Sequence, residues 1–201
     1  MQAIVVSPTR YVSNRWLANL IVVLLSFAVV VGLLAVASGL MPISLPNDVR
    51  EEIIKPLQGW LFIVTSVLFC FWLYRTHRNL RALGAEALSF SSIFTVGSFF
   101  VPLLNLYLPA AAVTEIWKAS DPAVPSGQDW RYTSRPSLIT AWWLIFLGEG
   151  FVEWLLIREQ IITNLQAPVV GDLFYVVSAL LTLLIVRGIN QRQELKAQAM
   201  Q

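Results

Sequence analysis

Residues 16–45 read WLANLIVVLLSFAVVVGLLAVASGLMPISL and contain no charged side chain. About 20 apolar residues in a helix cross a hydrocarbon core of about 30 Å, so this run is long enough to span a membrane. It also exceeds the roughly 7 to 15 apolar residues of a signal peptide. We therefore predict a retained membrane-spanning helix, although AVAS at 35–38 resembles a signal-peptidase site.

The composition favours the same class of protein along the whole chain. Of the 201 residues, 57% are hydrophobic and 13% are charged, whereas about 25% of the residues of a soluble domain are charged. A formal charge of +2 gives no argument for nucleic acid as a partner. The single cysteine, Cys70, excludes a disulfide framework and a cysteine metal site within one chain. The sequence predicts one all-α integral membrane domain over residues 1–201.

Five apolar segments are predicted to form the helical bundle. They cover about residues 17–40, 57–74, 93–113, 138–157 and 173–186, and a polar tail follows at 187–201. A loop with one helical turn at 48–54 is expected between the first two segments. Asp172 is expected to cap the fifth segment.

The third segment is irregular because it contains Pro102, Asn105 and Pro109. Each proline breaks helical hydrogen bonding, which frees the carbonyls of Ser98 and Asn105. Freed carbonyls must be covered by protein or water, so this segment should face the bundle interior or a wet cavity. Two interpretations stay open: a kinked helix that packs on its neighbours, and a broken helix whose carbonyls bind an ion or a small solute.

The distribution of Lys and Arg predicts the topology, because these residues gather on the cytoplasmic side. With five spanning segments, six of the 14 Lys and Arg residues lie on the side of the N-terminus and eight on the other. If the third segment re-enters without crossing, the numbers become eleven and three. We therefore predict four spanning helices, a proline-broken re-entrant segment and two cytoplasmic termini; five spanning helices are the alternative.

Three stretches resemble a known family. They read FCFWLYRTHRNLRALGAEALSF at 69–90, FFVPLLNLYLPAAAVTEIWKASDP at 99–122 and VRGINQRQE at 186–194. They are similar to the bacterial membrane family catalogued as domain of unknown function 4328. The resemblance implies a location in the inner membrane of a bacterium and implies no activity. The positions that carry it include Trp72, Arg75, Asn79, Gly84, Pro102, Asn105, Pro109, Glu115 and Trp117.

A basic turn follows the second segment and contains Arg75, Arg78 and Arg81. One interpretation is an anchor that binds the anionic headgroups of membrane lipids. The other is an ion pair of Arg75 or Arg78 with Glu115, which would hold the third segment in place. Nothing in the spacing gives the neighbouring His77 a nucleophile or a metal as partner.

Glu149 and Glu153 lie on one face of the fourth segment, because they are four residues apart, and Trp142 continues that stripe. A carboxylate in hydrocarbon is costly, so an intramembrane acid is a functional candidate. We expect Glu149 to be shielded from lipid and protonated, and Glu153 to reach the interface. Proton or cation coupling and a contact with another subunit stay open.

The sequence contains no pattern typical of an enzyme, a metal site or a cofactor site. We therefore predict a non-enzymatic multi-pass protein, a small structural or accessory subunit that packs against partner membrane proteins or copies of itself. The alternative is a small channel, transporter or lipid-binding protein that uses Glu149 and the broken third segment. A pore lined by Ser98, Asn105 and Glu149 would support this alternative.

Overall fold

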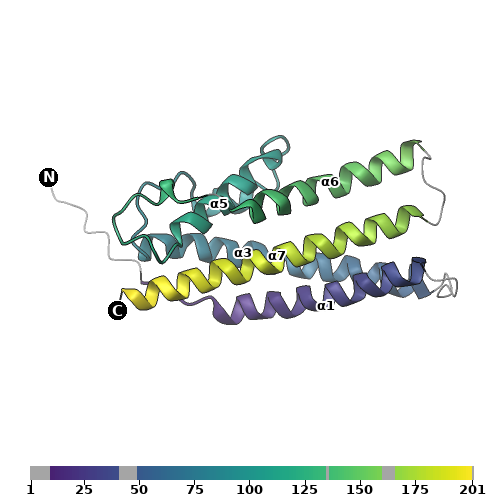
Figure 1. Cartoon of the computed structure of the whole chain (residues 1–201), viewed down its shortest axis with the longest axis horizontal. Coiled ribbons are helices and arrows are strands. Elements are labelled where there is room, and N and C mark those ends of the chain that lie inside the picture. The colour runs from purple at the N-terminus through teal and green to yellow at the C-terminus, as the bar shows by residue number, and fades with distance from the viewer. Residues whose placement is uncertain (1–9, 41–48, 135, 160–165, 201) are drawn as a thin grey trace. The chain divides into compact units, whose positions relative to one another are not determined.

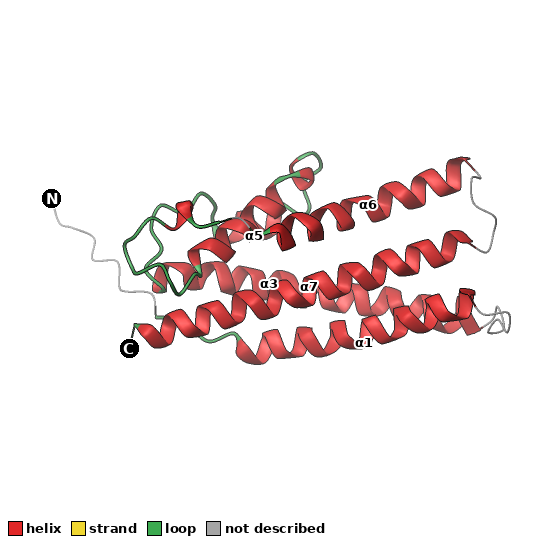
Figure 2. Ribbon diagram, viewed as in Figure 1, coloured by secondary structure: helices red, strands yellow, loops and turns green. Residues whose placement is uncertain are grey.

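A computed structural model describes residues 10–40, 49–134, 136–159 and 166–200, with the side chains of all of these except 153–159 and 166–168. The described residues form helices and turns and contain no strand (Figure 2). The long helices are α1 (Arg15–Leu40), α3 (Lys55–Ala82), α6 (Ser137–Glu159) and α7 (Gln166–Ala199). A π-helix, η1 (Arg50–Ile54), leads directly into α3.

Three helical stretches of the described chain are long and apolar enough to cross a membrane: Arg15–Leu40, Arg50–Ala82 and Val169–Ala199. A shorter apolar helix covers Ser137–Val152, where the description of side chains in α6 ends. Helices are therefore confirmed at four of the five predicted apolar segments. The helix predicted at 57–74 runs on through the basic turn to Ala82, and the one predicted at 173–186 begins already at Gln166.

The prediction of a single apolar segment at 93–113 needs correction in its detail, because the stretch is not one helix. It contains α4 (Ser92–Gly97), a 3-10 turn η2 (Leu104–Leu106) and α5 (Leu108–Ala119), which Figure 1 shows in teal as short pieces joined by turns. Pro109 lies in the first turn of α5, where a proline needs no donor partner. Proline therefore starts a helix here and does not kink one.

The chain divides into two compact units. Unit 1 consists of Met1–Trp16, Phe71–Arg135 and Gly188–Gln201, and unit 2 of Leu17–Cys70 and Pro136–Arg187. Both α3 and α7 continue from one unit into the other. The expectation of one domain over residues 1–201 stays a prediction.

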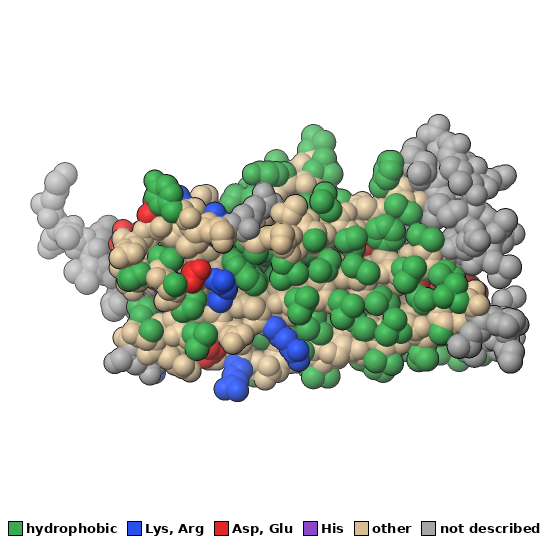
Figure 3. Space-filling view, viewed as in Figure 1, with side chains coloured by type: hydrophobic (Ala, Val, Ile, Leu, Met, Phe, Trp, Pro, Cys, Tyr) green, Lys and Arg blue, Asp and Glu red, His purple; other side chains and the backbone are tan. Residues whose placement is uncertain are grey.

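Unit 2 contains the apolar parts of the long helices. Its core between α1 and η1–α3 is built from Ala28, Val31, Ala35, Ile54 and Leu61. Many large apolar side chains of these helices point outward, and on the face drawn in Figure 3 they cover much of the surface of α1 and α7. Such a surface suits hydrocarbon as its surroundings.

The direction of each helix in unit 2 follows from its contacts with α7. A Cβ atom on Gly32 would lie 2.5 Å from Val176, and one on Gly39 would lie 2.4 Å from Val169, so α1 runs antiparallel to α7.

The other two long helices run in opposite directions. On α6, the indole of Trp142 donates to Thr182 at 3.0 Å, while Gly148 approaches Phe174, so α6 is also antiparallel to α7. Arg50, which leads into α3, and Gln58 of α3 both bond to Asp172 near the beginning of α7. Both helices therefore begin at the same end of unit 2 and run in the same direction.

Candidate functional site

Glu115 of α5 is the centre of a buried polar cluster in unit 1. Its side chain is 4% exposed. One carboxylate oxygen, Oε2, accepts from the backbone amide of Ser89 at 2.6 Å, and Oε1 accepts from the amide of Phe90 at 3.3 Å. His77 Nε2 lies 3.4 Å from Oε1, and His77 Nδ1 lies 2.9 Å from the hydroxyl of Ser92. The carboxylate thus joins α5 to α3 and to the turn before α4.

These contacts determine the charge of Glu115. Burial raises the pKa of the carboxyl group, but the hydrogen bonds from His77, Ser89 and Phe90 lower it, and the net pKa lies below its ordinary value. Glu115 is therefore ionised at neutral pH.

The predicted ion pair of Arg75 or Arg78 with Glu115 is wrong, because both arginines point elsewhere. Arg75 Nε donates to the side-chain oxygen of Asn14 at 2.7 Å. Arg78 is exposed and lies over the ring of Tyr74. His77, which lies between the two arginines in the sequence and is 2% exposed, contacts Glu115 in their place. On a helix, neighbouring residues point in different directions, so the sequence could not show which basic side chain faces α5.

The C-terminal part of α5 packs on the polar end of α7. Lys196 Nζ donates to the carbonyl of Ala119 at 2.9 Å, at the end of α5 where a cation is favoured. The guanidinium of Arg192 lies 4.6 Å from the ring centroid of Trp117 and pairs with Asp121 at 2.9 Å. Burial raises the pKa of Asp121, but the amide of Ala123 and Arg192 lower it, and the net pKa is below its ordinary value.

An N-terminal segment completes unit 1, and the sequence analysis missed it. Residues 10–14 precede α1 without regular secondary structure and lie on α3 and α7. Asn79, predicted only as a candidate polar residue, bonds with both backbone groups of Val12. Burial and the hydrogen bond to Glu194 raise the pKa of Tyr11, so its phenol remains a donor.

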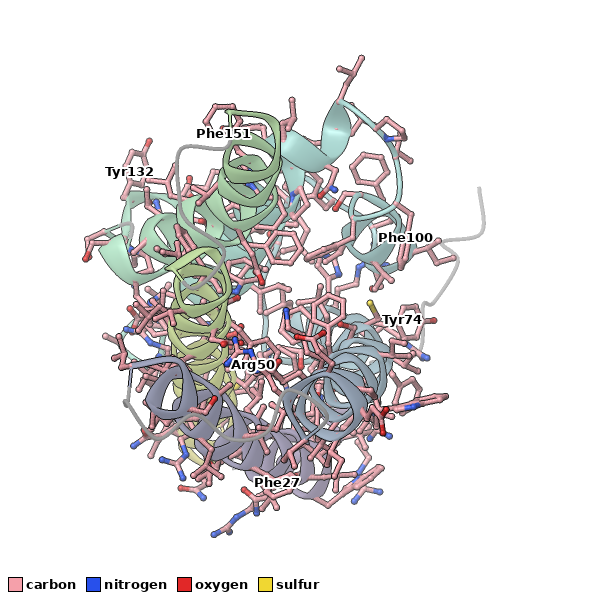
Figure 4. The ribbon with its side chains drawn as sticks, turned by 90° about the vertical axis from the view of Figure 1, so that its right-hand side faces the viewer. Phe27, Arg50, Tyr74, Phe100, Tyr132 and Phe151 are labelled. Carbon is pink, nitrogen blue, oxygen red and sulfur yellow. The ribbon has the colours of Figure 1, made fainter. Side chains whose placement is uncertain are left out.

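The tip of the broken segment is apolar and strained. Leu103 has φ 68° and ψ −47°, and the amide of Leu104 donates to the carbonyl of Pro102 at 2.9 Å, which makes a γ-turn centred on Leu103. The Oδ1 atom of Asn105 is buried and has no hydrogen-bond partner. Phe100, labelled in Figure 4, is exposed, like Leu103.

Unit 2 contains a buried ion pair that joins three helices. Arg50 Nη2 lies 2.5 Å from Asp172 Oδ2, and the side chains are 13% and 5% exposed. Arg50 Nη1 also donates to Ser38 and to the carbonyl of Ala35 in α1, and Gln58 donates to Asp172. In Figure 4 Arg50 lies among the helices, whereas Phe27 and Phe151 lie on the outside.

The prediction that Asp172 caps a helix is therefore wrong, because α7 begins earlier and Asp172 lies inside it. Asp172 is the one charged residue in the sequence between Glu159 and Arg187, which indicates that it needs a partner, but the sequence does not show that the partner is Arg50.

The acids of the fourth segment are described in part. Glu149 is half-buried on α6 and interacts electrostatically with Tyr175 of α7. Its protonation stays a prediction, and the side chain of Glu153 lies outside the described residues.

The residues of the predicted channel lining belong to different units: Ser98 and Asn105 to unit 1, and Glu149 to unit 2. The hydroxyl of Ser98 is already bonded to the carbonyl of Thr95 at 3.0 Å.

The described part of the chain is helical, and three of its helices are long and apolar enough to cross a membrane. The profile of the family described as domain of unknown function 4328 matches residues 45–191, and the chain belongs to this family. No curated protein and no solved structure matches the chain. Among the described residues, no three His, Cys, Asp or Glu side chains form a group that could hold a metal ion.

Proposed function

We propose that this chain is a multi-pass protein of the bacterial inner membrane with four spanning helices and with both termini in the cytoplasm. Residues 93–113 re-enter the membrane from the cytoplasmic side and return. In this arrangement the protein is a small structural or accessory subunit that packs against partner membrane proteins or against copies of itself.

The helix directions are the observation that carries the topology. Since α3 and α7 begin at the same end of unit 2, where Arg50 and Gln58 bond to Asp172, they cross the membrane in the same direction, and the chain between them returns. The antiparallel helix α6 provides that return. The stretch 83–136 then makes no net crossing. The alternative of five spanning helices would place Arg50 and Asp172 on opposite faces of the membrane, although they are in contact.

The partners of the broken segment support the re-entrant arrangement. Its two ends meet, because Glu115 bonds to the backbone at Ser89 and Phe90. Its helix α5 packs on the parts of α3 and α7 that contain His77 and Lys196. A helix that crossed the hydrocarbon would have apolar neighbours along its length instead.

The accessory role is supported by the outward side chains of unit 2. On α1, exposed apolar residues recur every three or four positions and form one stripe: Val23, Phe27, Val30 and Leu34. This spacing is the one with which helices pack against other helices. The role requires no chemistry at the buried polar groups, whose contacts hold the helices and the broken segment together.

Site-specific cross-linking in native membranes tests this role. A photo-reactive amino acid at Phe27 should join the chain to one membrane protein, or to a second copy, that also co-purifies in mild detergent. The same group at the buried Val31 is the matched control and should give only cross-links within the chain. Cross-links from Phe27 to lipid alone, with a monomeric chain after purification, would contradict the accessory role.

Anionic lipid headgroups are the second partner that we propose. Arg78 and Arg81 are exposed at the end of α3, whereas Arg75 is engaged by Asn14. An exposed arginine near a membrane surface contributes about 1 kcal/mol to attraction by anionic lipid. Arg78→Gln with Arg81→Gln should therefore reduce the anionic lipid retained by the purified protein, as measured by native mass spectrometry. Arg131→Gln, on another exposed arginine, is the control.

A further inference from the structure

The segment at residues 10–14 lies in a polar groove of unit 1 formed by α3 and α7. Asn79 on α3 bonds to both sides of the Val12 backbone: Oδ1 accepts from the amide at 3.3 Å, and Nδ2 donates to the carbonyl at 2.8 Å. This pair of bonds imitates the pairing of two β-strands. On the side of the segment it uses only the backbone groups of Val12, so another residue could take the place of Val12.

Side chains on either side of Val12 add sequence preference. The phenol of Tyr11 donates to Glu194 Oε1 at 2.9 Å, and Ser13 donates to the same oxygen. Asn14 is 1% exposed and enters the groove, where its amide donates to Thr76 at 3.3 Å and its oxygen accepts from Arg75 at 2.7 Å. The side-chain contacts of the segment thus come from an aromatic hydroxyl, three residues before an asparagine, and from Ser13 between them.

The segment is held by polar contacts more than by burial. Val12 and Ser13 are exposed, and among residues 10–14 the only fully buried side chain is that of Asn14. The backbone pairing and the two side-chain positions are contacts that another extended chain can reproduce, which is how grooves recognise peptides by adding a strand.

We propose that the groove of Asn79, Glu194, Thr76 and Arg75 is a recognition site for an extended Tyr-x-x-Asn segment of a partner protein, and that residues 11–14 occupy it as an internal competitor. This inference rests on the proposed accessory role, since it names the surface that a partner would use. The partner displaces the chain's own segment when it binds.

A fluorescent peptide RYVSNRW, which copies residues 10–16, tests the proposal on the purified full-length protein in detergent. Binding to the unaltered chain should be weak, because the internal segment has a high effective concentration. Asn14→Ala in the protein removes two hydrogen bonds of the internal segment and should tighten peptide binding by about tenfold. Asn79→Ala should abolish binding, because the groove then lacks the group that pairs with the backbone.

The matched controls leave the groove intact. Gln198→Ala changes an exposed residue of α7 and should not alter binding. A peptide with Ala in place of the residue that matches Asn14 needs no change to the protein, so its weaker binding cannot come from misfolding. Equal binding of the two peptides, or no binding to the Asn14→Ala protein, would overturn the proposal. Such a result would leave the cross-linking test at Phe27 unaffected, so the two proposals can fail separately.

Discussion

Glu115 shows how one residue holds a broken segment in place. Its two carboxylate oxygens satisfy two backbone amides and contact His77. Glu115→Gln keeps the shape but converts one acceptor oxygen into an amide donor that faces a backbone N–H group. We expect it to lower the free energy of unfolding by about 1 to 3 kcal/mol. Thermal unfolding in detergent measures this, with the exposed Glu86→Gln as the control. An unchanged midpoint would contradict the role of Glu115.

The same carboxylate predicts a dependence on pH. Because the pKa of folded Glu115 lies below its ordinary value of about 4.3, its contribution is complete above that value and is lost as the pH falls through the folded pKa. Hydrogen exchange of the Ser89 and Phe90 amides should therefore become relatively faster in acid, with the Thr95 amide as the internal reference. In the Glu115→Gln protein this pH dependence should disappear. If it persists, another group causes it.

At the scale of elements, the γ-turn between α4 and α5 stores strain at Leu103. Its φ of 68° is unfavourable for any residue with a Cβ atom, and its side chain is 82% exposed, so little packing is lost by removing it. Leu103→Gly should raise the stability by about 1 kcal/mol. Leu104→Gly, at a neighbour without positive φ, should lower it instead. Thermal midpoints of the two variants in detergent should move in opposite directions; a shift in the same direction would contradict the strain.

The ion pair of Arg50 and Asp172 connects α1, η1–α3 and α7 in unit 2. Arg50→Met or Asp172→Asn alone leaves the partner without its ion pair, and each should cost about 3 to 5 kcal/mol. The double change Arg50→Met with Asp172→Leu removes both charges and should recover most of that loss. Lys55→Met, at an exposed position, is the control. A double variant as unstable as the singles would show that the charges act separately.

At the scale of the whole molecule, the proposed topology predicts which positions share a side of the membrane. Single cysteines at Arg81 and Lys118, in a Cys70→Ser background, should react with an impermeant reagent from the cytoplasmic side. A cysteine at Ser44, which lies between α1 and η1 in the sequence, should react from the opposite side. The reason is that, in the proposed topology, the stretch 83–136 makes no net crossing between α3 and α7, which begin at the same end of unit 2. Labelling of positions 81 and 118 from different sides would refute the re-entrant segment.

The sequence by itself determined the class of protein and the places of the helices. Long uncharged runs can bury their backbone polar groups in hydrocarbon only as helices, so length and composition were sufficient. The prolines at 102 and 109 also showed which segment is irregular, and the motif around Asn79 and Glu115 showed the family.

Only the tertiary structure decided which polar side chains meet. The sequence indicated an arginine as the partner of Glu115, but rotation along α3 turns His77 towards α5 and Arg75 towards Asn14. It also gave no sign that Arg50 pairs with Asp172 or that residues 11–14 lie against α3 and α7. These partners are separated by many residues, and a hydrogen bond requires a distance and an angle that depend on how helices are rotated against each other. Hydrophobic periodicity determines which stretches form helices, whereas packing determines these rotations.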